Sequence, residues 1–258
     1  MLTRTIKRKN LPLNGYCHNV YSQNGEDGVL SELLLRLGMS VNYQGSCVEF
    51  GAWDGKHLSN TFALVESGWS AVYIELDVDR YKSLQKTAAL YPKITPINRL
   101  VEFDSQSINT IDQILRETPL AKNFDLLSID IDSYDLQVWQ SMQIYQPKIV
   151  VIEINSSFRT GLRRIHNRKG TQGNSFTSTL EIGLSKGYKL VCHTGNLVFV
   201  KAELFPLLKI PRHFSEYPEL LFVNYFLSQK DRLIDYLTPN RKIILGKIRA
   251  SLRHLNKP

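Results

Sequence analysis

The chain has 258 residues, 43% hydrophobic and 22% charged, which is the composition of a globular protein whose core needs no disulfide or metal. No apolar run of about 18 residues predicts a membrane-spanning helix, and no apolar segment of a secretory signal follows the basic start of the chain. Three cysteines, an odd number without CxxC spacing, favour reduced thiols and a cytoplasmic location.

The net charge of +8 is concentrated at the two ends of the chain. Residues 1–10 hold four basic side chains, residues 241–258 hold six, and neither segment has an acidic one. Without these ten, 22 basic and 24 acidic side chains remain, so the rest of the chain carries about −2. A nucleic-acid-binding protein would carry a basic stripe across its fold, and we therefore expect no nucleic-acid partner.

Helical spacing of apolar residues begins after Ser22 and stops at Gly38. From there strands and helices alternate, as in α/β proteins. Strands are predicted at Ser46–Gly51, Ala71–Leu76, Ile94–Leu100, Phe124–Ile131, Lys148–Ile154, Tyr188–His193 and Leu197–Lys201. Further helices are predicted at Asn60–Ser67, Asp79–Leu90, Ile108–Glu117, Leu136–Gln143 and Phe176–Lys186.

The strands predict a mixed sheet. The fourth and fifth contain continuous apolar runs, which suit strands buried on both faces of a parallel sheet. The last two are separated only by Thr194–Asn196, a connection so short that it joins antiparallel neighbours. The sequence therefore predicts an α/β fold with a Rossmann-like seven-stranded mixed sheet, helices on both faces and an antiparallel final hairpin.

The clearest candidate binding motif is the turn after the first predicted strand, Glu49–Gly55. Glycine at 51 lets the backbone approach a ligand at the carboxyl end of the strand, where open α/β sheets bind. The motif is not GxGxxG, and Glu49 and Asp54 would repel a pyrophosphate. They tolerate a cationic ligand such as S-adenosylmethionine, with its sulfonium and amino groups. The alternative is an ordinary tight turn.

Acidic residues follow the next two strands as well. Glu75 lies 24 residues after Gly51, near the end of the second predicted strand, where a carboxylate can accept hydrogen bonds from ribose hydroxyls. Asp104, after the third, is the candidate for an adenine contact. For Glu75 the alternative is a solvated acid at a strand end.

A second acidic cluster follows the fourth and fifth predicted strands: Asp130, Asp132, Asp135, Glu153 and Asn155. Neighbouring parallel strands lie about 4.8 Å apart, so their ends can share one site. Oxygen ligands suit Mg²⁺ or another divalent cation, which would lower the pKa of a bound hydroxyl. We predict metal ligands at Asp130, Asp132, Glu153 and Asn155. The alternatives are a metal-free general base and, for Asp135, a helix cap.

The loop 155–175 contains one histidine, His166, among four arginines, Arg159, Arg163, Arg164 and Arg168. His166 is a candidate base near an anionic acceptor, which the arginines would grip. The alternative is a solvated surface loop. Asp130, Asp132, Glu153 and His166 are the catalytic candidates.

Between about residues 21 and 202 the chain resembles FkbM-type methyltransferases. The resemblance rests on the order and spacing of short blocks: Tyr21–Asp27, Glu49–Gly55, Leu58–Thr61, Gly68–Trp69, Tyr73–Glu75, Ser128–Asp132 with Asp135, and Val151–Asn155. It implies a class I fold, whose last two strands also form a hairpin, and O-methylation, often of a sugar hydroxyl in a glycan. The predicted cofactor site comprises Gln23, Glu49, Gly51, Ala52, Asp54, Gly55, Asn60, Glu75, Asp104 and Asp130.

The sequence thus predicts a methyltransferase domain at 21–202, a basic lead at 1–20 and a helical extension with a basic tail at 203–258. The predicted function is S-adenosylmethionine-dependent O-methylation of a glycan or small-molecule hydroxyl. A nicotinamide-dependent oxidoreductase and a non-catalytic S-adenosylmethionine-binding module are the alternatives. In the tail, Ile244, Ile248, Leu252 and Leu255 form the apolar stripe of a basic helix. Such a helix predicts peripheral contact with the inner face of a membrane, or packing on the body. The oligomeric state stays open.

Overall fold

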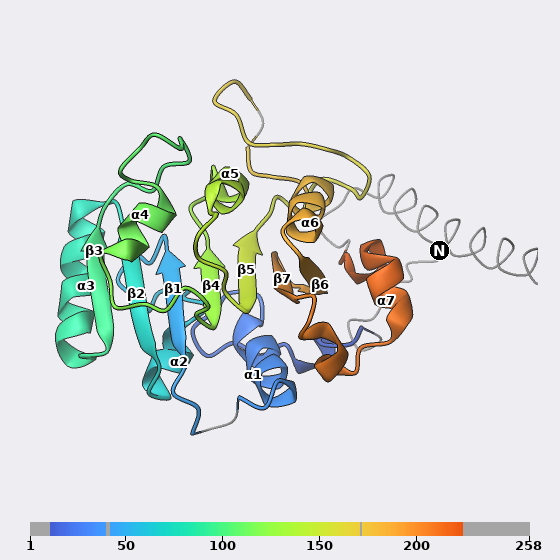
Figure 1. Ribbon diagram of the computed structural model, residues 1–258, viewed down its shortest axis with the longest axis horizontal. Coiled ribbons are helices and arrows are strands. Elements are labelled where there is room, and N and C mark those ends of the chain that lie inside the picture. The colour runs from blue at the N-terminus through green and yellow to red at the C-terminus, as the bar shows by residue number, and fades with distance from the viewer. Residues whose placement is uncertain (1–10, 40–41, 171, 224–258) are drawn as a thin grey trace, which may run out of the picture.

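A computed structural model describes residues 11–39, 42–170 and 172–223 of the chain (Figure 1). The predicted C-terminal helix with its apolar stripe, and the basic residues before position 11, lie outside the described residues. Within the described part, no helix is long and apolar enough to cross a membrane.

The centre of the fold is a seven-stranded sheet with the order β3-β2-β1-β4-β5-β7-β6. Its strands are β1 (Ser46–Phe50), β2 (Ser70–Glu75), β3 (Ile94–Asn98), β4 (Leu126–Ile129), β5 (Ile149–Glu153), β6 (Tyr188–His193) and β7 (Asn196–Lys201). The first five are parallel, and β7 enters between β5 and β6, antiparallel to both. The predicted mixed sheet and its final hairpin are confirmed.

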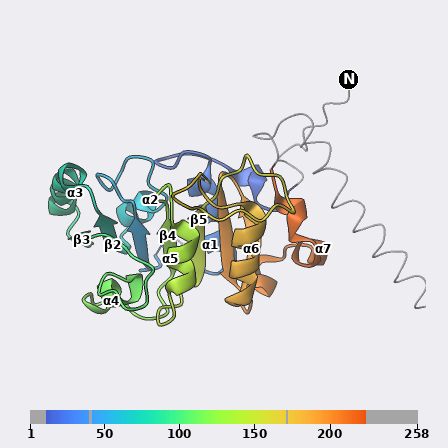
Figure 2. The same ribbon diagram turned by 90° about the horizontal axis from the view of Figure 1, so that it is seen from above.

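Helices cover both faces of this sheet. They are α1 (Glu26–Arg36), α2 (Phe62–Glu66), α3 (Val78–Leu90), α4 (Ile111–Arg116), α5 (Asp135–Ser141), α6 (Phe176–Ser185) and α7 (Arg212–Glu216). Figure 2 shows α4, α5 and α6 on one side of the sheet and α2 and α3 on the other. The predicted Rossmann-like α/β architecture is therefore present, and the helices predicted between residues 22 and 186 are found within a few residues of their expected bounds.

The start of α1 differs from the sequence prediction for a local reason. The helix begins at Glu26, four residues after the expected start at Ser22. The Asp27 carboxylate accepts the backbone N–H groups of Val20, Tyr21 and Ser22 at 2.7–2.8 Å. These bonds hold residues 20–22 in a turn, so that Gln23 and Asn24 lie in a loop beside the sheet.

Residues after β7 continue the same core. Three short helices follow the sheet: η3 (Phe205–Leu208), α7 and η4 (Pro218–Leu221), and a fourth, η2 (Asn14–Tyr16), precedes α1. The buried side chains of Leu208, Phe214 and Phe222 belong to the hydrophobic cluster that also contains the strands. The described part of the predicted extension therefore packs on the sheet.

Candidate functional site

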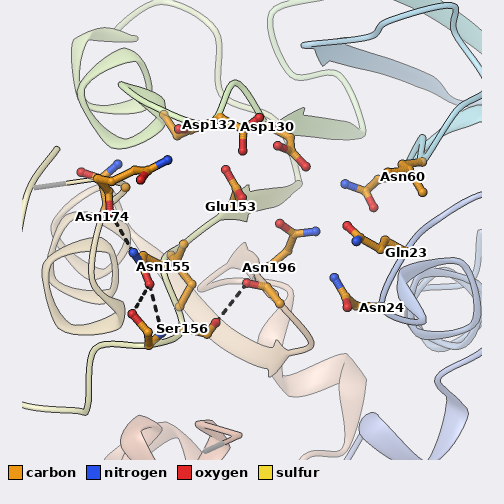
Figure 3. A pocket seen from close by; sticks show the side chains of 17 residues that line it. Gln23, Asn24, Asn60, Asp130, Asp132, Glu153, Asn155, Ser156, Asn174 and Asn196 are labelled. Carbon is orange, nitrogen blue, oxygen red and sulfur yellow. Dashed lines mark hydrogen bonds between the residues drawn. The ribbon is translucent and has the colours of Figure 1, made fainter. Parts of the chain in front are cut away.

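A cavity of about 440 Å³ opens at the carboxyl ends of β4 and β5, beside the loop before α1 (Figure 3). Its lining is polar. Seven amide side chains face it: Gln23, Asn24, Asn60, Asn155, Gln172, Asn174 and Asn196. Four carboxylates and two serines join them: Asp130, Asp132, Asp135, Glu153, Ser156 and Ser157. Among the described lining residues only Leu58 and Ile154 are large and apolar, and none is basic.

Gly51 brings the turn after β1 against the end of β4. Its φ of +79° is a left-handed conformation, and a Cβ at this position would lie 1.8 Å from the carbonyl oxygen of Asp130. Any side chain would therefore push the two strand ends apart. The sequence predicted that Gly51 lets the backbone approach a ligand, whereas the close neighbour of Gly51 in the structure is the backbone of Asp130.

Glu49, on β1, is buried and is not among the residues that line the cavity. Its carboxylate accepts the hydroxyls of Ser59 and Thr61 at 2.6 and 2.5 Å and the N–H of Asn60 at 3.0 Å. Burial raises the pKa of Glu49, and these hydrogen bonds oppose the shift. The carboxylate thus shapes the loop before α2 and presents Asn60, whose amide donates to Ser128 Oγ, to the cavity.

Glu75 connects the end of β2 to the turn after β1. It is 5% exposed, and its two carboxylate oxygens accept the N–H groups of Trp53 and Asp77, each at 2.8 Å. Asp54 accepts the N–H groups of Lys56 and His57 within the same turn. The structure therefore brings Glu75 to the Gly51 turn, although neither Glu75 nor Asp54 is among the residues that line the cavity.

The remaining predicted cofactor residues divide into two groups. Gln23, Asn60 and Asp130 line the cavity. Ala52 is buried in the core, and Gly55 packs on α3, where a Cβ would lie 2.9 Å from Leu84 Cδ1. Asp104 lies in the exposed loop after β3 and accepts the N–H of Gln106. The structure thus does not bring Ala52, Gly55 or Asp104 to the cavity.

Three of the four predicted metal ligands meet in space. One carboxylate oxygen from each of Asp130, Asp132 and Glu153 can be chosen so that the three lie within 4.8 Å of one another. Two ligands of a single Mg²⁺ at about 2.1 Å can be at most about 4.2 Å apart, and two ligands of Ca²⁺ at about 2.4 Å at most about 4.8 Å. The three carboxylate oxygens therefore fit a hard divalent cation, provided that for the smaller Mg²⁺ they move slightly closer to one another.

The carboxylates repel one another strongly. Burial, and then the charges of the neighbouring acids, raise the pKa of Asp130 to about 7 and that of Glu153 to about 9. Asp132 reaches the cluster through a left-handed backbone conformation, with φ of 58°, which aspartate tolerates better than most residues. The cluster holds negative charge that protons or a cation must offset.

Asn155 and Asp135, which also line the cavity, have other hydrogen-bond partners in the structure. The side-chain oxygen Oδ1 of Asn155 accepts the N–H and hydroxyl of Ser157, and the side-chain nitrogen Nδ2 donates to the backbone carbonyl of Gln172. Asp135 accepts the N–H groups of Ile131 and Ser133 and so fixes the turn before α5. The amide of Asn155 is thus engaged within its own loop, and the capping alternative for Asp135 agrees with its contacts.

His166 is not among the residues that line the cavity, although it hydrogen-bonds with Gly173 and Asn174, which do. Its Nδ1 accepts the N–H of Gly173 at 3.1 Å. Its ring packs edge-on against the ring of Tyr134, with the ring centroids 4.6 Å apart. Arg163 pairs with Glu181 on α6. The structure therefore does not place His166 or Arg163 where the sequence expected a base and an anion grip, because the loop 155–175 folds onto itself and onto α6.

Several cavity residues could not be found from the sequence. Asn24 and Asn196 come from segments far apart in the chain, and the buried Glu26 joins them. Its carboxylate accepts the N–H of Asn24 at 2.8 Å, the hydroxyl of Thr194 at 2.6 Å and the amide of Asn196 at 3.1 Å. Asn174 bridges the backbone of His166 and Ser133. No local pattern marks such long-range partners.

No family model matches the chain, and no curated protein matches it. Solved structures resemble it at low identity. A TehB-like SAM-dependent methyltransferase from Corynebacterium glutamicum is 14% identical over 73% of this chain and 92% of that one, with a TM-score of 0.39. The citrinin polyketide synthase CMeT domain is 13% identical over 71% and 55%, with a TM-score of 0.43. Mitomycin 7-O-methyltransferase MmcR is 9% identical over 67% and 55%, with a TM-score of 0.40. Similarities this low carry no argument about activity.

Proposed function

We propose that this chain is an S-adenosylmethionine-dependent O-methyltransferase that acts on a hydroxyl of a sugar, a glycan or a related small molecule. The observation that carries the proposal is the convergence of the Gly51 turn with Asp130 and Glu153 at the carboxyl ends of β1, β4 and β5. Ligands of open α/β sheets bind at this edge. The sheet order, with β7 reversed between β5 and β6, is the one that class I methyltransferases share.

The residues present fit the cofactor. Glu75 accepts one backbone N–H at each oxygen, and a carboxylate has about four acceptor positions, which leaves room for two ribose hydroxyls. Gly51 leaves space for backbone approach, and the described cavity lining has acids but no basic side chain to repel a sulfonium. Gly51, Asn60, Glu75 and Asp130 would hold the cofactor.

When bound, S-adenosylmethionine supplies a methyl group on a positively charged sulfur. The chain's own part is to align the acceptor hydroxyl and to take the proton that it loses. Asp130, whose pKa is raised to about 7, would accept that proton, because Glu153, with a pKa of about 9, already carries a proton at neutral pH. Alternatively, Asp130, Asp132 and Glu153 hold a divalent cation such as Mg²⁺, which would lower the pKa of the hydroxyl.

A sugar-like acceptor is supported by the chemistry of the cavity. Amides, carboxylates and serine hydroxyls both donate and accept hydrogen bonds, as a ligand with several hydroxyl groups requires. The described lining contains seven amides and no aromatic ring. The predicted cytoplasmic location, with peripheral contact at the inner membrane face, rests on the sequence alone and stays a prediction.

Calorimetry with S-adenosylhomocysteine tests the cofactor assignment. Wild-type protein is expected to bind, and Glu75→Gln to bind at least about tenfold more weakly, because a charged acceptor of hydroxyl hydrogen bonds is worth about 1.5 kcal/mol or more. Asp79→Asn, an exposed acid on the neighbouring helix α3, is the matched control and should bind as wild type does. Binding of a nicotinamide cofactor in place of S-adenosylhomocysteine would contradict the proposal.

Titration with Mn²⁺, followed by electron paramagnetic resonance, tests the metal assignment. Wild-type protein is expected to bind one ion, and Glu153→Gln and Asp132→Asn to lose at least about tenfold in affinity, since each removes a charged ligand. S-adenosylhomocysteine binding should survive both changes. Glu117→Gln, an exposed acid that pairs with Arg99, is the control. Equal Mn²⁺ affinity in all variants would show that Asp132 and Glu153 do not bind the metal. The alternative, in which a carboxylate acts as a general base without a metal, would then be favoured.

A further inference from the structure

A buried serine–histidine pair lies at the wall of the cavity and has no part in the proposed chemistry. His193, the last residue of β6, is fully buried, and its Nε2 is 2.9 Å from Oγ of Ser156, the third residue after β5. Ser156 lines the cavity (Figure 3). A histidine beside a serine is the arrangement in which hydrolases activate a nucleophile, so the position of the proton between them decides what the pair can do.

The proton position follows from the other ring nitrogen. The backbone N–H of Val223 points at His193 Nδ1 at 2.8 Å. A backbone N–H can only donate, so Nδ1 carries a lone pair, and the neutral imidazole then has its hydrogen on Nε2. Nε2–H donates to Ser156 Oγ. The pair is therefore reversed relative to a nucleophilic serine, whose proton passes to Nε2.

The segment after α7 holds the ring in this orientation. Phe222 stacks on His193 with ring centroids 4.9 Å apart and planes 7° apart, and Phe176 of α6 meets both rings edge-on. The His193 carbonyl accepts the amide of Asn14 at 2.7 Å. Because Phe222 stacks on the ring, Phe176 packs against its edge and the His193 backbone is tied, the ring cannot turn over without unpacking Phe222.

The proton of Ser156 consequently has to find another acceptor. The carbonyl of Gly195 lies 3.5 Å from Oγ, at the outer limit of a hydrogen bond. A ligand oxygen in the cavity at an ordinary distance of about 2.8 Å would be a better acceptor. The serine hydroxyl is thus oriented as a donor that a bound molecule can use.

We propose that Pro218–Val223 fixes His193 as the Nε2–H tautomer, which makes Ser156 a hydrogen-bond donor to a hydroxyl oxygen of the acceptor. Ser156 is then an acceptor-binding residue, His193 and Val223 are positioning residues, and the segment after the sheet controls one wall of the cavity. This inference rests on the proposed function for the identity of the acceptor, but the tautomer does not depend on it.

Long-range ¹H–¹⁵N NMR on the full chain reads the tautomer directly. The expected spectrum shows the His193 Nδ1 as an unprotonated, pyridine-type nitrogen and Nε2 as a protonated, pyrrole-type nitrogen. Val223→Pro, which removes the donor, should abolish this preference, and Ser156→Ala should leave it intact. A protonated Nδ1 in the wild-type chain overturns the proposal without any variant, and this measurement needs neither cofactor nor turnover.

Saturation-transfer NMR with the methyl α-glycosides of glucose, galactose and mannose as probes tests the acceptor contact. Wild-type protein is expected to bind at least one of them, and Ser156→Ala to bind it about three- to tenfold more weakly, the range for one neutral hydrogen bond. Ser156→Thr, which keeps the hydroxyl, should restore part of the affinity. Ser185→Ala, on the far end of α6, is the control. If Ser156→Ala binds the glycoside as tightly as wild type, or if wild type binds none of the three glycosides, the role of Ser156 is overturned. Failure of the wild-type protein to bind S-adenosylhomocysteine would overturn the proposed function instead.

Discussion

At the scale of single residues, the site depends on how closely two backbones approach. Gly51 has a left-handed φ and faces the Asp130 carbonyl, and the two features require glycine independently. The first costs another residue about 1–2 kcal/mol, and the second forces two strands of the central sheet apart. The turn that the sequence marks as a ligand-binding motif is therefore also a structural contact between β1 and β4.

Gly51→Ala is predicted to lower the free energy of unfolding by at least about 3 kcal/mol, because the new Cβ would lie 1.8 Å from the Asp130 oxygen. Gly187→Ala is the matched control. Gly187 has a similar φ of +84° with nothing within 4 Å of its Cβ position, so it should lose only about 1 kcal/mol. Urea unfolding measures both. Equal losses of unfolding free energy in the two variants would show that the clash of the new Cβ with the Asp130 carbonyl does not destabilise the protein.

At the scale of elements, the strand and helix pattern was largely predictable from the sequence. The apolar runs of β4 and β5 and the short turn before β7 were enough to give the sheet, because burial on both faces leaves a continuous signal. The proximity of Asp130, Asp132 and Glu153 was predictable too, because the carboxyl ends of neighbouring parallel strands lie at one edge of the sheet. The orientation of His166 was not, because the N–H of Gly173 and the ring of Tyr134 that hold it come from outside any local pattern.

The buried side chain of Asn174 is one of the contacts that hold the loop 155–175 to the turn before α5. Asn174 is 1% exposed, accepts the N–H of His166 at 3.0 Å and donates to the Ser133 carbonyl at 3.2 Å. Asn174→Ala should cost about 1 kcal/mol, since it leaves the part-buried N–H of His166 and carbonyl of Ser133 without this partner. Hydrogen exchange should then quicken at His166 and its neighbours. Asn167→Ala, an exposed residue of the same loop, is the control. Unchanged protection at His166 in Asn174→Ala would show that other contacts hold the loop.

At the scale of the whole molecule, the described residues after β7 are part of the sheet's core. Phe214 and Phe222 are buried, and Val223 reaches the wall of the cavity through His193. The sequence separated this segment from the domain because its helices are of four or five residues, too short for a periodic apolar pattern. The hydrogen bonds from Thr194 and Asn196 to Glu26 were not predicted for a related reason. These residues lie about 170 positions after Glu26 in the sequence, so no local pattern links them.

The proposed function depends on where the cofactor binds. A crystal structure of the chain grown with S-adenosylhomocysteine tests this most directly. The ligand is expected at the carboxyl edge of the sheet, in contact with the Gly51 turn and with its ribose hydroxyls bonded to the Glu75 carboxylate. A ligand bound elsewhere, or crystals in which saturating S-adenosylhomocysteine leaves this edge without it, would contradict the proposed methyltransferase.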